Sequence, residues 1–469
     1  MAARLDDLGA PPGVAVPDSA NPALLTDTVR GEWGMPGYVT SDAGSVLCIS
    51  SCRQSHNGGM RGHNFTDGPA ASAAAALTAG LDLEISCCGL NYTFPTLPAS
   101  VRAGLVPEAA LDAALTRTLQ YRFKGATLDG AVPGGDPWAA LGTADLSTPA
   151  SVALALDAAR QGVVLLKNDP ATGGPAPLLP LSASALAGRT VAVLGPVAND
   201  TLAMVGSYGN VATSLPITTP FSGLRDALPG TAVSLVVDAL CPNVTDCAGF
   251  SNATIAAAAQ ADVLVVALGV SAAINGYTCP AYENYNEKEE CDRHDTALPG
   301  AQLPLLQALA SLGKPLVLVL VSGGALAVDW AAASPSVPAI VHAPYLGVSA
   351  GTALADVILG AAPPSGRLTA TWYTAAGLAA VGGIEQYAMR ADGAYPGRTH
   401  RYLRDPGGAA VLFPFGYGLS YAVLGYEDAA LAPAAPAPCD TVAVNVTLRN
   451  AGDTDAVEVV QVGGRWRMG

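Results

Sequence analysis

Residues 30–46 read RGEWGMPGYVTSDAGSV, and the organisation of the chain can be worked out from this stretch. A turn from Gly34 to Gly37 leads into a β-rich run, Tyr38 to Thr40, which ends on Ser41 and Asp42. An acidic side chain at the end of a short buried strand, opening into a loop, is where α/β folds place catalytic groups. The alternative is that Asp42 caps the next helix, and the stretch read in isolation favours the cap.

Composition limits the function classes. The chain has 469 residues, of which 50% are hydrophobic and 13% charged, which is enough for two or three domains with large cores. The formal net charge of -15 argues against nucleic acid or an anionic membrane as a partner. No apolar run reaches the length needed to span a bilayer.

Several features favour an oxidising, extracellular compartment. Cys241 and Cys247 bracket a short loop, as do Cys279 and Cys291, and such spacing suits small disulfide loops, although buried thiols remain an alternative. Six Asn-x-Ser/Thr sites accompany the nine cysteines, and they are Asn64, Asn91, Asn199, Asn243, Asn252 and Asn445. The first residues contain no apolar segment of the signal-peptide kind, which predicts that the start of a secreted protein is missing.

The wider run LLTDTVRGEWGMPGYVTSDAGSV, residues 24–46, resembles the nucleophile segment of glycoside hydrolase family 3, of the form LLTDxLRxEWGFxGYVxSDxxxV. In that family the aspartate of the motif is the catalytic nucleophile, so the resemblance implies that Asp42 is the nucleophile here. The motif is long and therefore specific. We also expect a short helix over 23–31, before the run that leads to Asp42.

A second stretch, AGLDLEISCCG at residues 79–89, predicts a short strand and loop after a helix over 69–79. Asp82 and Glu84 stand at alternate positions and would face one side of that strand. The resemblance makes Asp82 and Glu84 candidate substrate-binding residues. Either could instead be structural, and we expect this of Glu84. A further helix is expected from Pro107 to Phe123.

Two strand–helix units precede residue 125, whereas a complete (β/α)8 barrel needs eight units and about 250 residues. By resemblance, residues 1–125 correspond to the C-terminal remnant of the family's barrel. The family's substrate-holding Lys-His pair would belong to the absent portion. As an open barrel remnant exposes apolar strand edges, we expect the chain as written to be inactive.

Residues 126–150 are rich in Gly, Pro and Asp and predict a linker. Residues 151–378 predict an open α/β sandwich sheet, because apolar Val/Leu/Ile runs alternate with helical patterns such as 302–312 and 350–359. The predicted parallel strands cover residues 163–167, 190–196, 262–270, 315–323 and 339–345. The turn after residue 194 is GPVAND rather than a G-x-G-x-x-G phosphate turn, which argues against a nucleotide site.

The loop at residues 271–297 contains NEKEECDRHD and, on its residues alone, favours a solvated acidic loop. The xylosidase-like members of the family have E-x-E-G/F-x-D-R at this place. Alignment on Asp292-Arg293 assigns Glu289 as the general acid/base and matches Glu287 to the earlier acidic position. A one-residue shift would make Glu290 the acid/base instead.

The two predicted carboxyl groups fit one reaction. Retention at a β-glycosidic bond requires a nucleophilic carboxylate and a protonated carboxyl about 5–5.5 Å apart. Asp42 would form the glycosyl-enzyme, and Glu289 would protonate the leaving oxygen and then deprotonate water. The residues come from different domains, so the active site is expected where the domains meet. The mechanism requires no metal or organic cofactor.

Residues 379–421 would form a connector that ends in PFGYGLSY, and residues 422–469 the truncated start of a fibronectin type III-like β-sandwich, since an immunoglobulin-like sandwich needs roughly 100 residues. Two strands are expected around a turn at 450–455. The resemblance predicts a secreted exo-acting β-xylosidase that acts on oligosaccharides or polysaccharides such as xylan, and some such enzymes also accept α-L-arabinofuranosides. The alternatives are a β-glucosidase of the same family and an inactive, carbohydrate-binding fragment.

Overall fold

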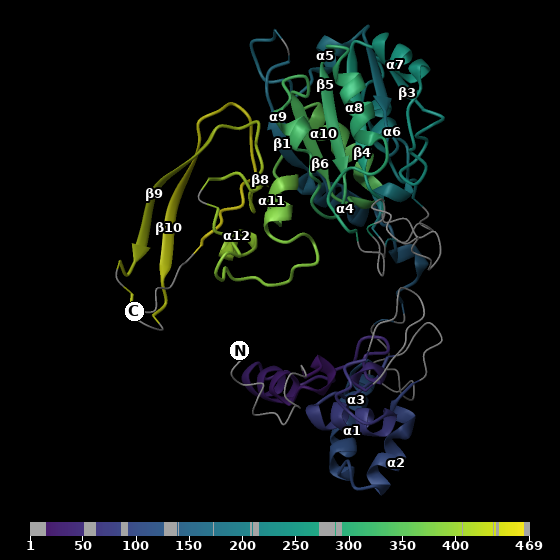
Figure 1. The fold of residues 1–469 in the computed structure, drawn as a ribbon, viewed down its shortest axis with the longest axis vertical. Coiled ribbons are helices and arrows are strands. Elements are labelled where there is room, and N and C mark those ends of the chain that lie inside the picture. The colour runs from purple at the N-terminus through teal and green to yellow at the C-terminus, as the bar shows by residue number, and fades with distance from the viewer. Residues whose placement is uncertain are drawn as a thin grey trace. The chain divides into compact units, whose positions relative to one another are not determined.

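The structure is a computed structural model that describes residues 16–50, 62–85, 92–125, 138, 140–171, 173–206, 209, 215–271, 287, 293–405, 407–434, 436–437 and 440–463. The chain divides into two compact units, Met1–Asp145 and Leu146–Gly469 (Figure 1). This division falls within the predicted linker 126–150, and the finer domain boundaries stay predictions. In the described residues, no helix is both long and apolar enough to cross a membrane.

The first unit is mostly helical in its described part. Its helical segments are η3 (Asp18–Ala20), the π-helical η4 (Ala23–Glu32), η5 (Leu47–Ile49), α1 (Pro69–Ala79), η6 (Phe94–Thr96), α2 (Leu97–Arg102), α3 (Glu108–Lys124) and η7 (Thr143–Asp145). The three helices expected from the sequence are therefore confirmed, as η4, α1 and α3.

Helix α1 is the core of the first unit. It begins with Pro69 and ends at Gly80, whose φ of 111° few other residues adopt. Its small side chains let neighbours approach from two sides. One apolar cluster joins Ala76 and Ala79 to η4 and η5, and a second joins Ala73 and Leu77 to α2 and α3.

The predicted strands of this unit are shorter than expected. Thr40 and Leu83 form a single parallel bridge, supported by hydrogen bonds from Ser41 N to Leu83 O (2.9 Å) and from Leu83 N to Val39 O (3.1 Å). The described residues of the unit supply no third strand beside this pair. Two isolated extended segments form little regular ladder without neighbours. We refer to residues 39–41 and 82–85 together as the bridged segments.

The second unit is built on a mixed six-stranded sheet of order β1-β6-β5-β4-β2-β3. Its strands are β1 (Val164–Asn168), β2 (Thr190–Leu194), β3 (Ala232–Val236), β4 (Val263–Gly269), β5 (Leu316–Val321) and β6 (Ala339–Ala343). All neighbouring pairs are parallel except β1 with β6. The five predicted strands are thus present, but the expectation that the first of them is parallel was wrong. Sheets of this class often carry an antiparallel edge strand.

Helices cover both faces of this sheet. Described helical elements of the unit are α4 (Pro149–Gly162), α5 (Ala183–Leu186), η8 (Leu202–Met204), α6 (Pro220–Ala227), α7 (Asn252–Ala259), α8 (Gln302–Ala310), α9 (Asp329–Ala333), η9 (Gly347–Ser349), α10 (Ala350–Ile358), α11 (Ala375–Ala380) and α12 (Thr399–Tyr402). Helices α6 and α10 pack on one face with α4 against α10, and α7, α8 and α9 pack on the other. The result is a three-layer α/β/α arrangement, as the alternating pattern predicts.

Two small antiparallel sheets follow. One pairs β7 (Trp372–Tyr373) with β8 (Val411–Phe413), and the other pairs β9 (Leu424–Ala432) with β10 (Ala443–Asn450). Of the two strands predicted around residues 450–455, only β10 forms. Residues 456–463 are not a strand, and Val457, Val459 and Val462 are exposed there. Alternation alone does not make a strand where no partner edge accepts its hydrogen bonds.

Candidate active site

Asp42 lies immediately after the first bridged segment. Ser41 is buried, and its Oγ accepts a hydrogen bond from Ile85 N at 2.9 Å, while Asp42 itself is exposed. A turn follows, closed by Ser45 N and Asp42 O at 3.2 Å. The next helical segment, η5, begins only at Leu47, and the Asp42 carboxylate accepts from the adjacent Ala43 N at 2.6 Å. Asp42 therefore does not cap that segment. Its side chain is exposed, and hydrogen bonds hold the backbone on both sides of it.

A cavity of about 470 Å³ opens beside this turn. Its lining includes Asp42, the polar residues Asp18 and Ser19 of η3, Ser45 of the turn, and His63. Leu25 and Leu81 contribute apolar surface to the lining. Small-molecule sites combine a few polar groups with apolar surface in this way, and the volume suits a small ligand.

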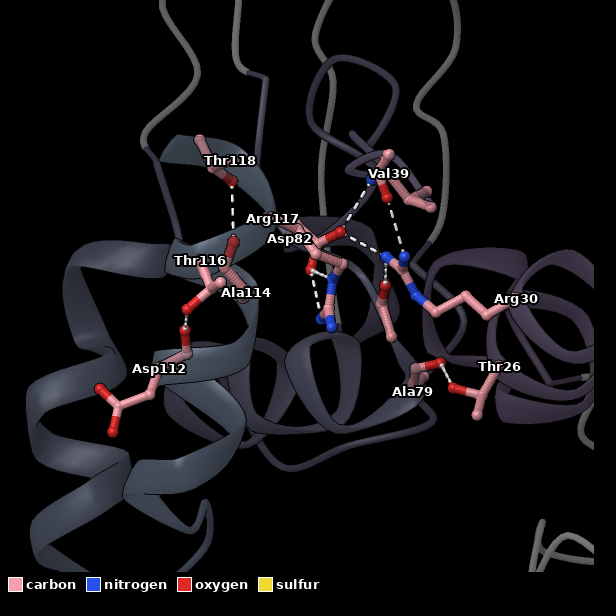
Figure 2. A network of polar contacts seen from close by, with 12 residues as sticks. Thr26, Arg30, Val39, Ala79, Asp82, Asp112, Ala114, Thr116, Arg117 and Thr118 are labelled. Atoms are coloured by element: carbon pink, nitrogen blue, oxygen red, sulfur yellow. Dashed lines mark hydrogen bonds and ion pairs between the residues drawn. The ribbon is translucent and has the colours of Figure 1, made fainter. Parts of the chain in front are cut away.

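Asp82 is the centre of a buried ionic network in the same unit (Figure 2). Its side chain has no exposed surface. Oδ1 accepts two hydrogen bonds from the Arg117 guanidinium, at 3.0 and 2.7 Å, and Oδ2 pairs with Arg30 and accepts from Val39 N at 2.8 Å. Contact between Asp82 and a sugar stays a prediction, whereas these protein contacts are what the structure shows.

Glu84, two residues further on, has a different set of partners. Its carboxylate accepts hydrogen bonds from Thr93 N (2.8 and 2.7 Å) and Phe94 N (2.6 Å). These two amides lie at the start of η6, where backbone N–H groups lack helical partners. Glu84 therefore satisfies a helix N-terminus, in keeping with the structural role expected from the sequence.

In the second unit, Glu287 lies at the carboxyl edge of the parallel sheet. Its backbone N–H donates to Ser271 O (3.0 Å), just beyond β4. Its carboxylate accepts from Gly323 N (2.5 Å), beyond β5, and from the Tyr345 hydroxyl (2.7 Å), beyond β6. Ligands of open α/β sheets bind at this edge. Glu287 therefore fastens its loop to three successive strand ends.

Arg293 completes this anchor. Its guanidinium pairs with the Glu287 carboxylate at 2.6 Å and donates to Ala325 O at 2.8 Å, and both side chains are largely buried. The chain between them contains Glu289 and Glu290, the predicted and alternative acid/base residues, which lie outside the described residues. Glu287 and Arg293, on either side of the undescribed acidic residues, are thus both held at the sheet edge. The loop is therefore not solvated throughout, as its residues alone would suggest.

Tyr345 and Arg117 are parts of these arrangements that sequence reasoning missed. Burial, the negative charge of Glu287 and the hydrogen bond to it raise the pKa of Tyr345, so its hydroxyl remains a donor. Its position as the last residue of a predicted buried strand was a usable signal. Arg117 offered no local signal, because its partner lies 35 residues away.

His342, on β6, gives the second unit a pH-dependent stability. Burial lowers the pKa of His342 to about 4, although its Nε2 lies 3.0 Å from Ser322 O and Glu287 acts in the opposite direction. The unfolded chain binds this proton near pH 6.5, so stability is lost as the pH falls from about 6.5 towards 4, by about 3 kcal/mol.

We expect the His342→Gln variant to lose less stability than the parent protein as the pH falls from about 6.5 towards 4. The measurement is urea unfolding at about pH 7 and about pH 4.5, compared between the variant and the parent protein. His400→Gln, at an exposed histidine, is the matched control and should keep the parental slope. An unchanged slope in His342→Gln would contradict the assignment.

Comparison with known proteins shows which family the chain belongs to. The sequence profile of the Glycosyl hydrolase family 3 N terminal domain matches residues 2–121, and that of the Glycosyl hydrolase family 3 C-terminal domain matches residues 163–421. The chain belongs to glycosyl hydrolase family 3. The first profile includes Asp42, and the second includes the anchored acidic loop.

Family 3 relatives agree with the resemblance. Beta-D-xylosidase 1 of Arabidopsis thaliana is 38% identical over 408 residues, which cover 86% of this chain and 46% of the relative. Beta-xylosidase/alpha-L-arabinofuranosidase 1 of Medicago sativa subsp. varia is 34% identical over 88% of this chain and 47% of its own length. The chain thus spans about half the length of the curated relatives it matches.

Solved structures give the same picture. A family 3 exo-β-xylosidase in complex with a xylobiose aziridine activity-based probe superposes with a TM-score of 0.71 at 28% identity, over 88% of this chain and 48% of that protein. A β-glucosidase from Erythrobacter marinus superposes with a TM-score of 0.68, also at 28% identity, over 93% of this chain and 54% of that protein. The α/β fold is therefore shared with both kinds of glycosidase.

Proposed function

We propose that this chain belongs to a retaining exo-β-xylosidase in which Asp42 is the nucleophile and Glu289 the general acid/base. The observation that carries the proposal is the exposed Asp42 carboxylate on the wall of a cavity, at the end of a segment held by backbone hydrogen bonds. Relatives named β-xylosidase support the choice of xylose. Substrates would be β-linked xylose at the end of an oligosaccharide or xylan, and α-L-arabinofuranosides in addition.

The proposed reaction has two displacements. A carboxylate oxygen of Asp42 attacks the anomeric carbon, while the bond to the leaving oxygen breaks and that oxygen takes the proton of Glu289. In the second step Glu289 removes a proton from water, the resulting hydroxide attacks the same carbon, and Asp42 is released. Two inversions leave the product with the β configuration, and the atoms balance without a cofactor.

Turnover of aryl β-xyloside, β-glucoside and α-L-arabinofuranoside by the protein expressed from its full reading frame tests this proposal. We expect the largest kcat/KM for the xyloside, and β-xylose as the first product by proton NMR. A first product of α configuration would contradict the retaining mechanism. Larger kcat/KM for the glucoside would support the β-glucosidase alternative, which the match to solved β-glucosidases favours. Absence of any turnover would support an inactive, at most carbohydrate-binding, protein.

The proposed location is extracellular or in the cell wall. Cys241 and Cys247 form a disulfide, which is typical of proteins from oxidising compartments. Four glycosylation motifs have exposed asparagines, at Asn64, Asn199, Asn252 and Asn445. The second cysteine pair of the sequence prediction, Cys279 and Cys291, lies outside the described residues.

A further inference from the structure

The buried carboxylate of Asp82 has a full set of protein partners and no surface left for a sugar. Four contacts converge on its two oxygens, from Arg30, Arg117 and Val39 N, and Figure 2 shows the two guanidinium groups approaching it from different elements. Arg30 comes from η4 and Arg117 from α3. A carboxylate without partners would be costly at such a site, whereas two arginines and an amide satisfy it.

The contact to Val39 links this network to the nucleophile. Val39 begins the bridged segment that Asp42 follows, and Val39 O accepts from Asp82 N at 2.9 Å and from Leu83 N at 3.1 Å. The Asp82 side chain and backbone therefore hold both polar groups of the Val39 backbone. Ser41 is fixed in turn by Leu83 O and by Ile85 N, so little freedom remains in the backbone just before Asp42.

Arg30 extends the same network to the residues that precede each bridged segment. Its Nη1 donates to Gly37 O at 2.8 Å, before the nucleophile segment, and its Nη2 donates to Gly80 O at 3.0 Å, before Asp82. One guanidinium thus binds the two turns that precede the bridged segments. Its contact with Asp82 holds that guanidinium in place.

From these contacts we propose that Asp82 is a positioning residue for the nucleophile, which acts on Asp42 through the backbone of Val39 to Ser41 rather than by touching the sugar. The proposal rests on the proposed function, because positioning matters for the rate only if Asp42 attacks the substrate. Misplacing a reacting group by about 1 Å can cost about 10²-fold in rate. The network therefore contributes to the chemical step and not only to stability.

The test is Asp82→Asn in the protein expressed from its full reading frame. The amide keeps the size of the side chain, but it removes the charge and turns one acceptor into a donor that faces a guanidinium. We expect the rate of glycosyl-enzyme formation from 2,4-dinitrophenyl β-xyloside to fall about 10²-fold. The inhibition constant of xylose should stay within about twofold of the parent value, because ground-state binding is not affected.

Arg117→Lys is a milder second variant, because it keeps the positive charge and loses the two-pronged contact. It should lower the same rate by a smaller factor, and it keeps the proposal testable if Asp82→Asn does not fold. Asp356→Asn is the matched control, since it breaks the ion pair between Arg160 and Asp356 in the second unit. The control should leave the rate of glycosyl-enzyme formation unchanged.

Hydrogen exchange supplies a readout that does not need activity. Peptides that span residues 38–46 should lose protection in Asp82→Asn and keep it in Asp356→Asn. Unchanged protection and rate in Asp82→Asn would overturn the proposal, as would a rise in the xylose inhibition constant equal to the loss of rate. A parent protein without glycosidase activity would overturn the proposed function, and exchange would still decide whether Asp82 fixes this segment.

Discussion

Replacing Asp42 by alanine should abolish formation of the glycosyl-enzyme and lower the hydrolysis of aryl β-xylosides by about 10⁴-fold or more, the range seen when a nucleophilic catalyst is removed. The reason is chemical, since a methyl group cannot form the covalent intermediate. Because Asp42 is exposed and its carboxylate contacts the adjacent Ala43 N, the fold should tolerate the change. Pre-steady-state kinetics with a dinitrophenyl β-xyloside measure the effect.

Azide makes this experiment more specific. In Asp42→Ala, azide can enter the space of the lost carboxylate and attack the anomeric carbon directly, which would give an α-xylosyl azide by one inversion. Asp27→Asn is the matched control, because Asp27 is an exposed aspartate on η4 of the same unit and does not line the cavity. Normal turnover in Asp42→Ala, or a comparable loss in Asp27→Asn, would contradict the assignment of Asp42.

Replacing Glu289 by alanine should have an effect that depends on the leaving group. With a poor leaving group the first step needs a proton, so hydrolysis should fall by about 10²- to 10⁴-fold. With 2,4-dinitrophenol the first step needs little help, so the glycosyl-enzyme should form at nearly the parental rate and accumulate. Comparing kcat/KM over a series of aryl β-xylosides measures the dependence, and azide should restore turnover and give a β-xylosyl azide.

Glu290→Ala is the matched control for this prediction. The two residues are neighbours in one acidic run, so both variants remove the same charge from the same loop. We expect Glu290→Ala to show no dependence on the leaving group beyond that of the parent. If Glu290→Ala shows the dependence and Glu289→Ala does not, the alignment of the loop is shifted by one residue and Glu290 is the acid/base.

The parts of the fold that the sequence predicts well are those with strong local patterns. Strands β4 and β5 are continuous apolar runs buried on both faces, and α1 is an alanine-rich helix between a proline and a glycine. Strand β3 escaped prediction because it lies at the sheet edge, where its side chains are only partly buried and its pattern is weak. The antiparallel direction of β1 also has no local signal, because direction is decided by the connections between strands.

The candidate site shows the same contrast. Asp42 is predicted to be the nucleophile from a long contiguous motif, and Glu287 is matched to an acidic position of the family from its place before Asp292 and Arg293. The roles of Asp82 and Tyr345 depend on partners from distant parts of the chain, Arg117 and Glu287 respectively. No local pattern identifies such partners, so the burial of Asp82 against two arginines becomes visible only in the fold.

The most direct test of the central claim is to trap the covalent intermediate. The protein expressed from its full reading frame is inactivated with an activated 2-deoxy-2-fluoro β-xyloside, digested, and sequenced by mass spectrometry. The account predicts one fluoroxylosyl group attached to Asp42. Attachment to a different carboxylate, or turnover that continues without any labelled peptide, would contradict it.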